Sequence, residues 1–505
     1  MANQAANQQV QTRTRKIGID LDHTILNVAE GIEGSEILFG FKAFVMEQRE
    51  QKQPLFIVAH EVDQAAEVEA HLENKGFFKD TGSGGLGFEK GNLIFVASED
   101  EKVAKIAELG LTHFIDDQSA TFAHASFPKE TQPLVFGPRQ EGASFPGFSE
   151  WSELTNYFYW EEGVSSQSGA RILAVTPLKE HGDNFIYKVD TENDRSYILK
   201  HFLESTENAP ERLETEINHL NSLHAVGIHN VPKPYWHRGC WALFSYLEGS
   251  SVTQVGENEL AQFIDMLTQL DRKHEELGEQ KVKTAAGART RLSQFADELN
   301  GRWNAVLSAC QRPDGPKDIM LFMLTDLEQL RQDNLNHFYL WIKREKWDKE
   351  AELAEKDLIF SPSDFGFHNT LKNGDNTLYF LDFEESGWDD PAKLLADFFY
   401  NTEQTLDIKD KLAVLDAFVK QREWDSNFIK RFWAIADLVA VEWILKTLEV
   451  VVPEEMRRLQ YVNPGLDPKQ LIKDRFKIAI KMREDFQPME HLCKHDQLLD
   501  EEGEI

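Results

Sequence analysis

The sequence predicts an α/β domain built around a parallel sheet in residues 16–160 and an α+β domain of two lobes in residues 171–490. In the first domain, short apolar runs alternate with charged amphipathic stretches. The second domain begins with strand-like runs and continues with amphipathic helical stretches. The chain has 505 residues, 41% of them hydrophobic, so it is long enough to bury more than one core.

The strands of the first domain are predicted by the apolar runs KIGIDL, PLFIVA, NLIFVA and THFID. These runs lack strict alternation, which is typical of strands that are buried on both faces of a parallel sheet. Amphipathic stretches such as EDEKVAKIAELG lie between the runs and predict helices. The resulting βαβ rhythm predicts a doubly wound sheet.

Residues 161–170, EEGVSSQSGA, are mostly small or polar and predict a linker between the domains. The runs RILAVTPL, NFIYKVD and SYILKHF follow and predict an antiparallel meander in a small β-rich lobe, residues 171–249. Residues 250–490 are predicted to be mostly helical, with one strand-like island from LIFSPSDFGFHNTL to LYFLDFEE. Residues 491–505 are acidic, and we expect them to form a solvated tail.

Charge and cysteine content limit the classes of partner. The formal net charge is −32 and no basic patch offsets it, so we expect neither nucleic acid nor an anionic membrane surface as a partner. The three cysteines stand far apart without metal-ligand or redox spacing, which fits a reducing compartment. Neither a membrane-spanning apolar stretch nor a secretion signal is evident. We therefore expect a cytoplasmic protein that acts on small molecules.

Paired carboxylates follow two of the predicted strands. Asp20 and Asp22 end the first apolar run, and Asp116 and Asp117 end the last one. Because ligands of open α/β sheets bind at the carboxyl edge of the strands, we expect these side chains to share a site. One carboxylate can attack phosphorus while another exchanges a proton with the leaving and attacking oxygens. Mg²⁺ takes oxygen ligands of this kind from separate chain segments.

A lysine on the intervening helix can complete this site. Lys102 opens the helix EDEKVAKIAELG, and Lys105 is the alternative. A cation at either place can pair with the nucleophilic carboxylate and with a bound phosphoryl group.

DLDHT, the lysine-bearing helix and FIDD together resemble the haloacid dehalogenase superfamily over residues 16–158. Its members have a doubly wound sheet and are mostly Mg²⁺-dependent phosphatases. The resemblance implies that Asp20 is the nucleophile, Asp22 the acid/base and Lys102 the charge neutraliser. It also implies that Mg²⁺ is held by Asp20, Asp22, and Asp116 or Asp117.

One position departs from that superfamily. Its second strand usually ends in Ser or Thr, which binds the phosphoryl group, whereas this chain has Ala59 and His60. Two interpretations follow. His60 substitutes as the hydrogen-bond donor, or the site is weakened or inactive as a phosphatase.

A second set of residues with phosphate chemistry lies in the second domain. Lys200 closes the strand SYILK, after a turn that contains Gly182 and that can cover phosphates. Glu216 lies on the next predicted helix, where it can pair with Lys200 and direct it at a nucleotide. Further on, Asp364 is followed five residues later by Asn369, and Asp382 follows on the next hairpin. An Asp that accepts a hydroxyl proton, together with an Asn and an Asp that bind Mg²⁺, is typical of kinases.

Lys200, Glu216, LFSYLEGSS, SDFGFHN and LDFEESGWDDP, in this order, resemble the aminoglycoside phosphotransferase and choline kinase group over residues 171–490. That group has the bilobal protein-kinase-like fold and uses ATP and Mg²⁺. The resemblance implies that Asp364 is the catalytic base and that Asn369 and Asp382 are metal ligands. It also implies that Lys200 contacts the phosphates and that Tyr246 to Glu248 form the hinge beside the adenine. One departure is the dipeptide before the base, which is usually His-Gly and is Pro362-Ser363 in this chain.

Together the two sites predict a bifunctional enzyme. A kinase of a sugar, amino sugar or amino alcohol would be joined to a phosphatase that acts on a phosphorylated metabolite through an aspartyl-phosphate. We favour consecutive steps over opposed ones. The alternative is a regulatory or scaffold protein, in which a degenerate first domain senses phosphorylated ligands and the second binds nucleotide. A protein kinase is disfavoured because no activation segment follows LDFEE.

Overall fold

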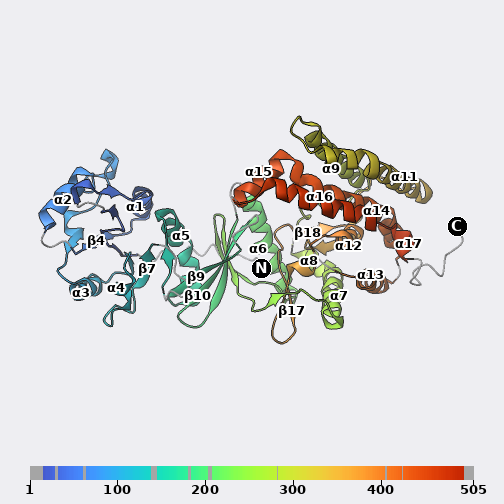
Figure 1. Ribbon diagram of the computed structural model, residues 1–505. Coiled ribbons are helices and arrows are strands. Elements are labelled where there is room, and N and C mark those ends of the chain that lie inside the picture. Colours follow the sequence, from blue (N-terminus) through green and yellow to red (C-terminus); the bar gives the residue numbers. More distant parts are fainter. Residues whose placement is uncertain are drawn as a thin grey trace. The chain divides into compact units, whose positions relative to one another are not determined.

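The computed structural model describes residues 15–28, 32–60, 64–137, 145–179, 184–202, 208–280, 282–403, 406–423, 425–463 and 465–493. The chain forms two compact units (Figure 1). The first comprises Met1–Leu178, Tyr187–Leu199 and Tyr235–Arg238, and the second comprises Lys179–Ile186, Lys200–Pro234 and Gly239–Ile505. Among the described residues, no helix is long and apolar enough to cross a membrane.

A six-stranded parallel sheet forms the centre of the first unit, as predicted. Its strand order is β5-β4-β1-β6-β7-β8. Ile19 in β1 lies opposite Ile57 in β4 and Ile115 in β6, so the carboxyl ends of these three central strands lie side by side. The strands are β1 (Ile17–Ile19), β4 (Leu55–Ala59), β5 (Leu93–Phe95), β6 (His113–Asp116), β7 (Gln132–Phe136) and β8 (Gly147–Phe148).

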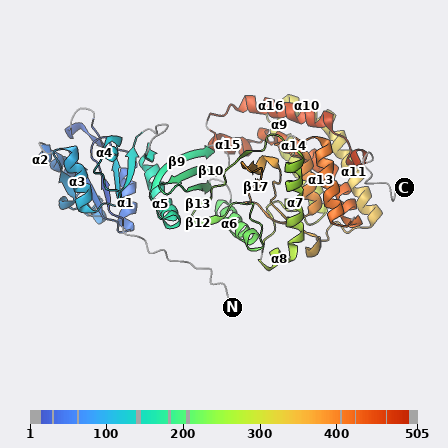
Figure 2. The same ribbon diagram turned by 90° about the horizontal axis from the view of Figure 1, so that it is seen from below.

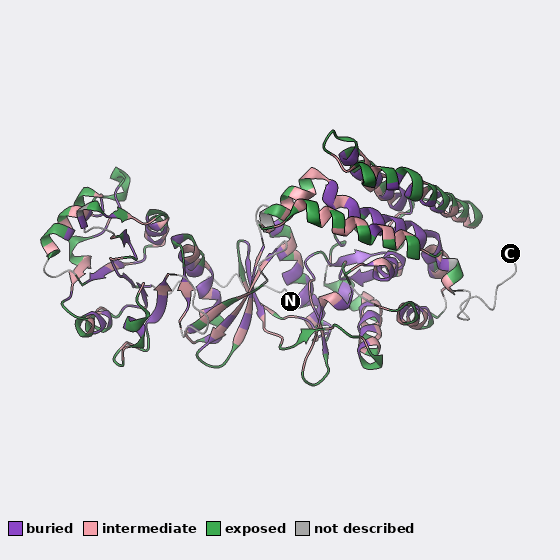
Figure 3. Cartoon of the chain, in the orientation of Figure 1, coloured by how far each residue is buried: buried purple, intermediate pink, exposed green. Residues whose placement is uncertain are grey.

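Helices and one small hairpin connect these strands. A core of apolar side chains includes Val58 from β4, Ile106 from α3 and Phe114 from β6. Figure 3 shows buried residues along the strands of this sheet. The connecting elements are β2 (Leu26–Asn27), η1 (Ile32–Gly34), β3 (Glu36–Ile37), α1 (Phe41–Glu50), α2 (Ala65–Asn74), η3 (Thr81–Ser83), η4 (Lys90–Asn92), α3 (Glu99–Leu109), α4 (Ser119–Ala123) and α5 (Trp151–Ser168).

The expected linker at residues 161–170 is wrong for most of its length, because α5 continues to Ser168. Gly163 is small for a packing reason. A Cβ atom at this position would lie 2.4 Å from the ring of Trp236, so the indole packs directly on the helix backbone. The helix ends at Gly169, whose φ of 66° suits a residue without a side chain.

The strands between Ile172 and Ser245 form a five-stranded sheet with the order β12-β13-β11-β10-β9. The three strands of the predicted meander, β9, β10 and β11, are neighbours in chain order. Helix α6 (Ala209–Ala225) follows β11 and carries Glu216. The strands are β9 (Ile172–Lys179), β10 (Asn184–Thr191), β11 (Ser196–Phe202), β12 (Pro234–Arg238) and β13 (Trp241–Ser245).

The rest of the second unit is mostly helical, as predicted, and packs around α14 (Figure 2). Most residues of α14 are buried, and the helix contacts α9, α11, α12 and α16. The helices are α7 (Glu257–Arg272), α8 (His274–Glu279), α9 (Ser293–Gln311), α10 (Lys317–Phe322), the π-helix η5 (Met323–Leu327), α11 (Glu328–Glu345), η6 (Glu355–Asp357), η7 (Phe367–Asn369), α12 (Pro391–Tyr400), α13 (Ile408–Gln421), α14 (Ser426–Leu448), η8 (Glu449–Val451), α15 (Pro453–Val462), α16 (Pro468–Asp485) and α17 (Met489–Cys493).

The predicted strand-like island forms two small sheets. One has the order β14-β16-β17 and the other pairs β15 with β18. Thr370 lies opposite Phe380, and Leu381 N donates to Asn369 O at 2.9 Å, so Asn369 and Asp382 lie close to each other in space. The strands are β14 (Ser250–Ser251), β15 (Ile359–Ser361), β16 (Thr370–Lys372), β17 (Leu378–Phe380) and β18 (Gly387–Asp389).

Candidate functional site

In the first unit, Lys102 joins two carboxylates at the carboxyl edge of the sheet. Its Nζ lies 2.7 Å from Asp20 Oδ1, after β1, and 2.6 Å from Asp116 Oδ2, at the end of β6. All three residues are buried. Ser98 begins the helix, because its side chain accepts a hydrogen bond from Glu101 N, and Lys102 follows in the first turn. Lys105 instead pairs with Glu108 on the exposed face, so Lys102 is the lysine that reaches the carboxylates.

Burial sets the protonation of this cluster. Burial raises the pKa of Asp20 and the neighbouring charge of Asp116 raises it further, whereas Lys102 opposes both effects. For Lys102, burial alone lowers the pKa, but the charges of Asp20 and Asp116 outweigh it and the net pKa is raised. Lys102 therefore stays protonated, and Asp20 and Asp116 both interact with its charge.

The same edge has the ligands for a divalent cation. Oxygen atoms of Asp20, Asp116 and Asp117 lie within 4.8 Å of one another. Among the described residues, Asp22 Oδ1 and Asp117 Oδ1 are buried and have no hydrogen-bond partner. Orphaned buried carboxylate oxygens are costly, and Mg²⁺ prefers such ligands, so these residues fit the ion.

Ala59 and His60 follow the neighbouring strand. Ala59 is buried at the end of β4, where it has no polar side chain to offer. His60 is partly exposed, and its Nε2 lies 3.4 Å from Glu99 Oε2 at the start of α3. The imidazole is thus held near the first turn of the helix that carries Lys102.

In the second unit, Lys200 of β11 is surrounded by three carboxylates. The expected ion pair with Glu216 of α6 forms at 2.8 Å, and Asp382 lies 3.4 Å away. Glu384, to which the sequence analysis gave no role, lies 2.8 Å from Lys200 and also pairs with Arg212. Glu384 is the second acidic residue of the motif DFEE, and this position was the signal in the sequence that could have identified it.

Burial alone lowers the pKa of Lys200, but Glu216, Glu384 and Asp382 together raise it far above its usual value. Burial also raises the pKa of Glu216 to about 7, against the attraction of Lys200. Lys200 is therefore a permanently charged group at the centre of an acidic cluster.

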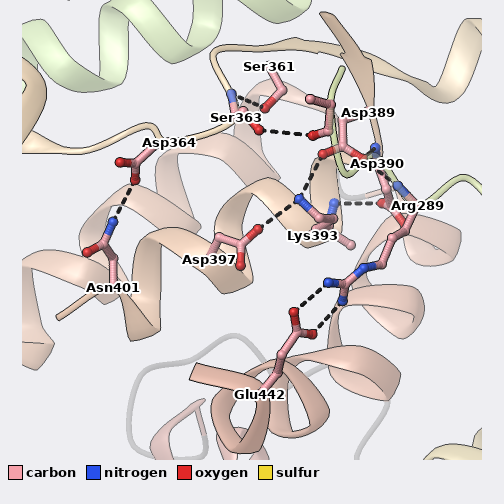
Figure 4. A network of polar contacts seen from close by, with 12 residues as sticks. Arg289, Ser361, Ser363, Asp364, Asp389, Asp390, Lys393, Asp397, Asn401 and Glu442 are labelled. Atoms are coloured by element: carbon pink, nitrogen blue, oxygen red, sulfur yellow. Dashed lines mark hydrogen bonds and ion pairs between the residues drawn. The ribbon is translucent and has the colours of Figure 1, made fainter. Parts of the chain in front are cut away.

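Asp364 lies in the loop between β15 and η7 and is held from several sides. Asn401 Nδ2 donates to Asp364 Oδ1 at 2.8 Å (Figure 4). His368 Nε2 donates to Asp364 Oδ2 at 3.0 Å. Asn369 Nδ2 donates to the Asp364 carbonyl at 3.0 Å. The sequence analysis missed His368 and Asn401 as partners of this carboxylate. His368 is only four residues along the chain, whereas Asn401 comes from the end of α12 and had no local signal.

Desolvation alone raises the pKa of Asp364, but the hydrogen bond and charge of His368 lower it below its usual value. Burial in turn lowers the pKa of His368, and Asp364, Glu403 and Asp382 reverse this and raise it. The charge of Asp382 acts on His368, and Asp382 also lies beside Lys200, so it connects the two groups of residues. The Asp364 side chain remains 48% exposed, so a ligand can reach it.

Backbone geometry also marks this loop. Ser363, in place of the usual glycine, has a φ of 77°, and Asp382 has a φ of 65°. Left-handed conformations of non-glycine residues cluster at functional sites because the surrounding structure holds them against the strain. The Ser363 hydroxyl donates to Ala286 O at 3.3 Å, which is one contact that holds it.

The remaining predicted residues are Tyr246 and Glu248 of the hinge and Gly182 of the turn. Tyr246 and Glu248 lie between β13 and β14, where the chain leaves the five-stranded sheet, and both are at least partly exposed. Gly182 lies outside the described residues, as does most of the expected acidic tail.

A cavity of about 460 Å³ opens beside Asp364 and Ser363. Ion pairs build its wall: Arg289 binds Glu442 in a bidentate contact at 2.5 Å, and Lys393 lies 3.0 Å from both Asp389 and Asp397 (Figure 4). A partly exposed carboxylate that lines a polar cavity of this kind is typical of a class of protein that transfers a group to a small polar acceptor.

The comparison with known families agrees with this class. The family described as "Phosphotransferase enzyme family" matches residues 174–426, and the chain belongs to this family. The match begins at residue 174, so the relationship of residues 16–158 to the haloacid dehalogenase superfamily stays a prediction.

Solved structures with similarity include two kinases and one phosphotransferase. A choline kinase from Streptococcus pneumoniae has 20% identity and a TM-score of 0.40, covering 66% of this chain and 100% of its own. A spectinomycin phosphotransferase in complex with ADP and spectinomycin has 13% identity and a TM-score of 0.43, covering 63% and 95%. An ethanolamine kinase from Plasmodium vivax has 15% identity and a TM-score of 0.39, covering 61% and 82%. None of the curated proteins matches the chain.

Proposed function

We propose that the second unit is an ATP-dependent kinase that phosphorylates a hydroxyl group of a sugar, amino sugar or amino alcohol. The observation that carries the proposal is the Asp364 carboxylate. It is kept ionised by His368, it is oriented by Asn401, and it lines a cavity of small-molecule size.

Each residue has a role in this reaction. Asp364 accepts the proton of the acceptor hydroxyl as the hydroxyl oxygen attacks the terminal phosphorus and ADP leaves. Lys200, held by Glu216, binds the phosphates, and the segment from Tyr246 to Glu248 flanks the adenine. Gly182, which lies outside the described residues, is assigned to phosphate binding. Asn369 and Asp382 would hold Mg²⁺, which neutralises phosphate charge when it is bound.

The test is ³¹P NMR of the full chain with Mg-ATP and pools of sugars, amino sugars and amino alcohols. Wild type should give a new phosphoester, and D364N should lose it by at least about 100-fold while still binding nucleotide. D375N, an exposed carboxylate on the turn between β16 and β17, is the matched control and should behave as wild type. A D364N variant with full turnover would refute the assignment of the base.

For the first unit we propose a Mg²⁺-dependent phosphatase. Asp20 attacks phosphorus and forms an aspartyl-phosphate, while Asp22 gives its proton to the leaving oxygen. Water then attacks the phosphoaspartate, Asp22 takes a proton back, and inorganic phosphate leaves. Lys102 holds the Asp20 carboxylate in place and offsets the charge of the phosphoryl group. Mg²⁺, held by Asp20, Asp22 and Asp116 or Asp117, would supply further charge neutralisation.

Ala59 favours a second candidate function for this unit, the sensing of phosphorylated ligands without hydrolysis, because no hydroxyl donor ends β4. The two are separated by incubating wild type, D20N and the control D80N with sugar phosphates and Mg²⁺. Phosphate release that requires Asp20 supports the phosphatase. Binding of sugar phosphates without release supports the sensor. With both sites active, we favour consecutive phosphorylation and dephosphorylation of one metabolite.

A further inference from the structure

The cationic side chains of the cavity beside Asp364 differ in whether they are paired. Arg289 pairs with Glu442, Arg302 with Glu298 at 2.9 Å, and Lys393 with Asp397 at 3.0 Å. Lys446 of α14 lines the same cavity. Within the part of the chain that the structure describes, it has no carboxylate within ion-pair distance. One positive charge of the cavity therefore remains available to a ligand.

The Lys446 ammonium instead lies over Trp443, which also lines the cavity. Its Nζ is 4.1 Å from the centre of the ring, a cation–π contact. Trp443 is fixed in turn, because its Nε1 donates to Asp397 Oδ1 at 2.9 Å. Recognition of a quaternary ammonium needs open aromatic faces, and Lys446 already covers this one. This part of the cavity is thus suited to an anionic group.

Lys446 and Asp364 line the same cavity of about 460 Å³, so one small molecule can contact both. Its charge contributes to lowering the pKa of Asp364, after the larger effect of His368, and it opposes the burial that raises the pKa of Glu385. Asp297 and Glu385, which have no ion-pair partner among the described residues, add hydrogen-bond acceptors to the cavity lining.

We propose that Lys446 binds an anionic group, a carboxylate or a phosphate, of the acceptor whose hydroxyl group faces Asp364. The inference rests on the proposed kinase function and narrows its substrates to sugars, amino sugars or amino alcohols that carry a carboxylate or a phosphate. The free carboxylates Asp297 and Glu385 accept hydrogen bonds from further hydroxyl or amino groups of the same molecule. A quaternary ammonium alcohol is then a poor acceptor.

The experiment compares acceptors that differ only in the anionic group. L-Homoserine is paired with 3-amino-1-propanol for the carboxylate, and glucosamine 6-phosphate with glucosamine for the phosphate; choline serves as the quaternary ammonium. Turnover is followed by ADP release, and binding is measured separately by ligand-observed NMR. The variants are K446M, K446R and the control K430M, which removes a lysine of the same helix that does not line the cavity.

We expect wild type to prefer one anionic series, which identifies the carboxylate or the phosphate. K446M should raise the KM or Kd of that acceptor about 10- to 100-fold, leave the KM of ATP unchanged and remove the preference for the anionic acceptor. K446R keeps the positive charge and should retain most of this preference. Preference for the uncharged partners or for choline would overturn the inference, as would a K446M effect on ATP alone. In either case the kinase assignment would stand, since it depends on D364N. Absence of turnover with Lys446-dependent binding would overturn the kinase and support the anion site.

Discussion

At the scale of single residues, the two sites hold their carboxylates in different ways. Asp20 shares a buried lysine with Asp116, so its charge is set by desolvation and by one cation. The Asp364 carboxylate is half exposed and accepts hydrogen bonds from the amides of Asn369 and Asn401 and from the His368 imidazole. A metal ion bound in the first arrangement would stabilise the charged form of Asp20, whereas in the second arrangement His368 already favours the charged form of Asp364.

Asp20 should therefore make the metal-free first unit sensitive to pH. Its pKa is raised from 3.8 to about 8, so its contribution to stability is present below about pH 4 and is lost as the pH rises through about 8. We expect metal-free D20N to lose less stability than wild type over this range, and to gain less from Mg²⁺. Thermal unfolding followed by circular dichroism, with EDTA or Mg²⁺, checks this. Equal pH dependence of D20N, D80N and wild type would contradict it.

His368 should control the acid limb of the kinase reaction. Its hydrogen bond and charge lower the pKa of Asp364, so in H368Q that pKa rises and the acid limb of kcat/KM moves to higher pH. The imidazole is a second readout. Its pKa is raised above 6.5 mainly by Asp364, and NMR of ¹³C-labelled histidine should show it fall in D364N. An unchanged acid limb in H368Q would mean that His368 has only a packing role.

At the scale of elements, α14 serves both the core and the cavity. One part of its surface packs against α9, α11, α12 and α16, while Glu442, Trp443 and Lys446 line the cavity. Glu442 is buried and binds Arg289 through both oxygens, and Arg302 lies 3.2 Å from it. The helix thus fixes the cavity wall through charge pairs that water does not screen.

Removing Glu442 should destabilise the second unit strongly. In E442A the Arg289 guanidinium stays buried without its partner, which costs about 3–5 kcal/mol. E449A is the control, because Glu449 is more exposed and Arg302 keeps Glu298 and Glu442; it should cost at most about 1 kcal/mol. Urea unfolding measures both free energies. A cost below about 1 kcal/mol for E442A would show that the pair contributes little.

At the scale of the whole molecule, the net charge of −32 is the dominant physical feature. Like charges spread over the folded chain repel one another and destabilise the compact state. Acidic residues also surround both sites. Divalent cations and cationic side chains at these sites reduce the repulsion between the negative charges of the chain.

Salt should therefore stabilise this protein. Raising NaCl from about 0.02 M to about 0.2 M shortens the screening length to less than about 10 Å, and we expect Tm to increase. The measurement is made in EDTA, so that divalent cations do not contribute. KCl at equal ionic strength should give the same increase, since screening does not depend on the monovalent ion. A Tm that falls or stays constant would show that specific ion pairs outweigh the general repulsion.

Much of the fold could be predicted because its signals are local. Buried parallel strands need contiguous apolar residues, so KIGIDL, PLFIVA and THFID could be identified from the sequence alone, and the helical second unit from its amphipathic period. The prediction of a linker was wrong because the cause of its composition is a long-range contact. Gly163 is small because Trp236, far along the chain, packs on it, and composition cannot separate that cause from flexibility.

The sequence alone identified the acidic motifs around Asp20, Asp116, Asp364 and Asp382, because spacing along a strand or loop brings such groups to one edge. Long-range packing was needed to select Lys102 over Lys105 and to add Glu384 and Asn401 to the sites. Trp443 and Lys446 are three residues apart on α14, so helix geometry alone brings them together, but only packing places this pair in the cavity. Which side of a helix faces inward, and which charge remains unpaired there, depends on how the elements dock against one another.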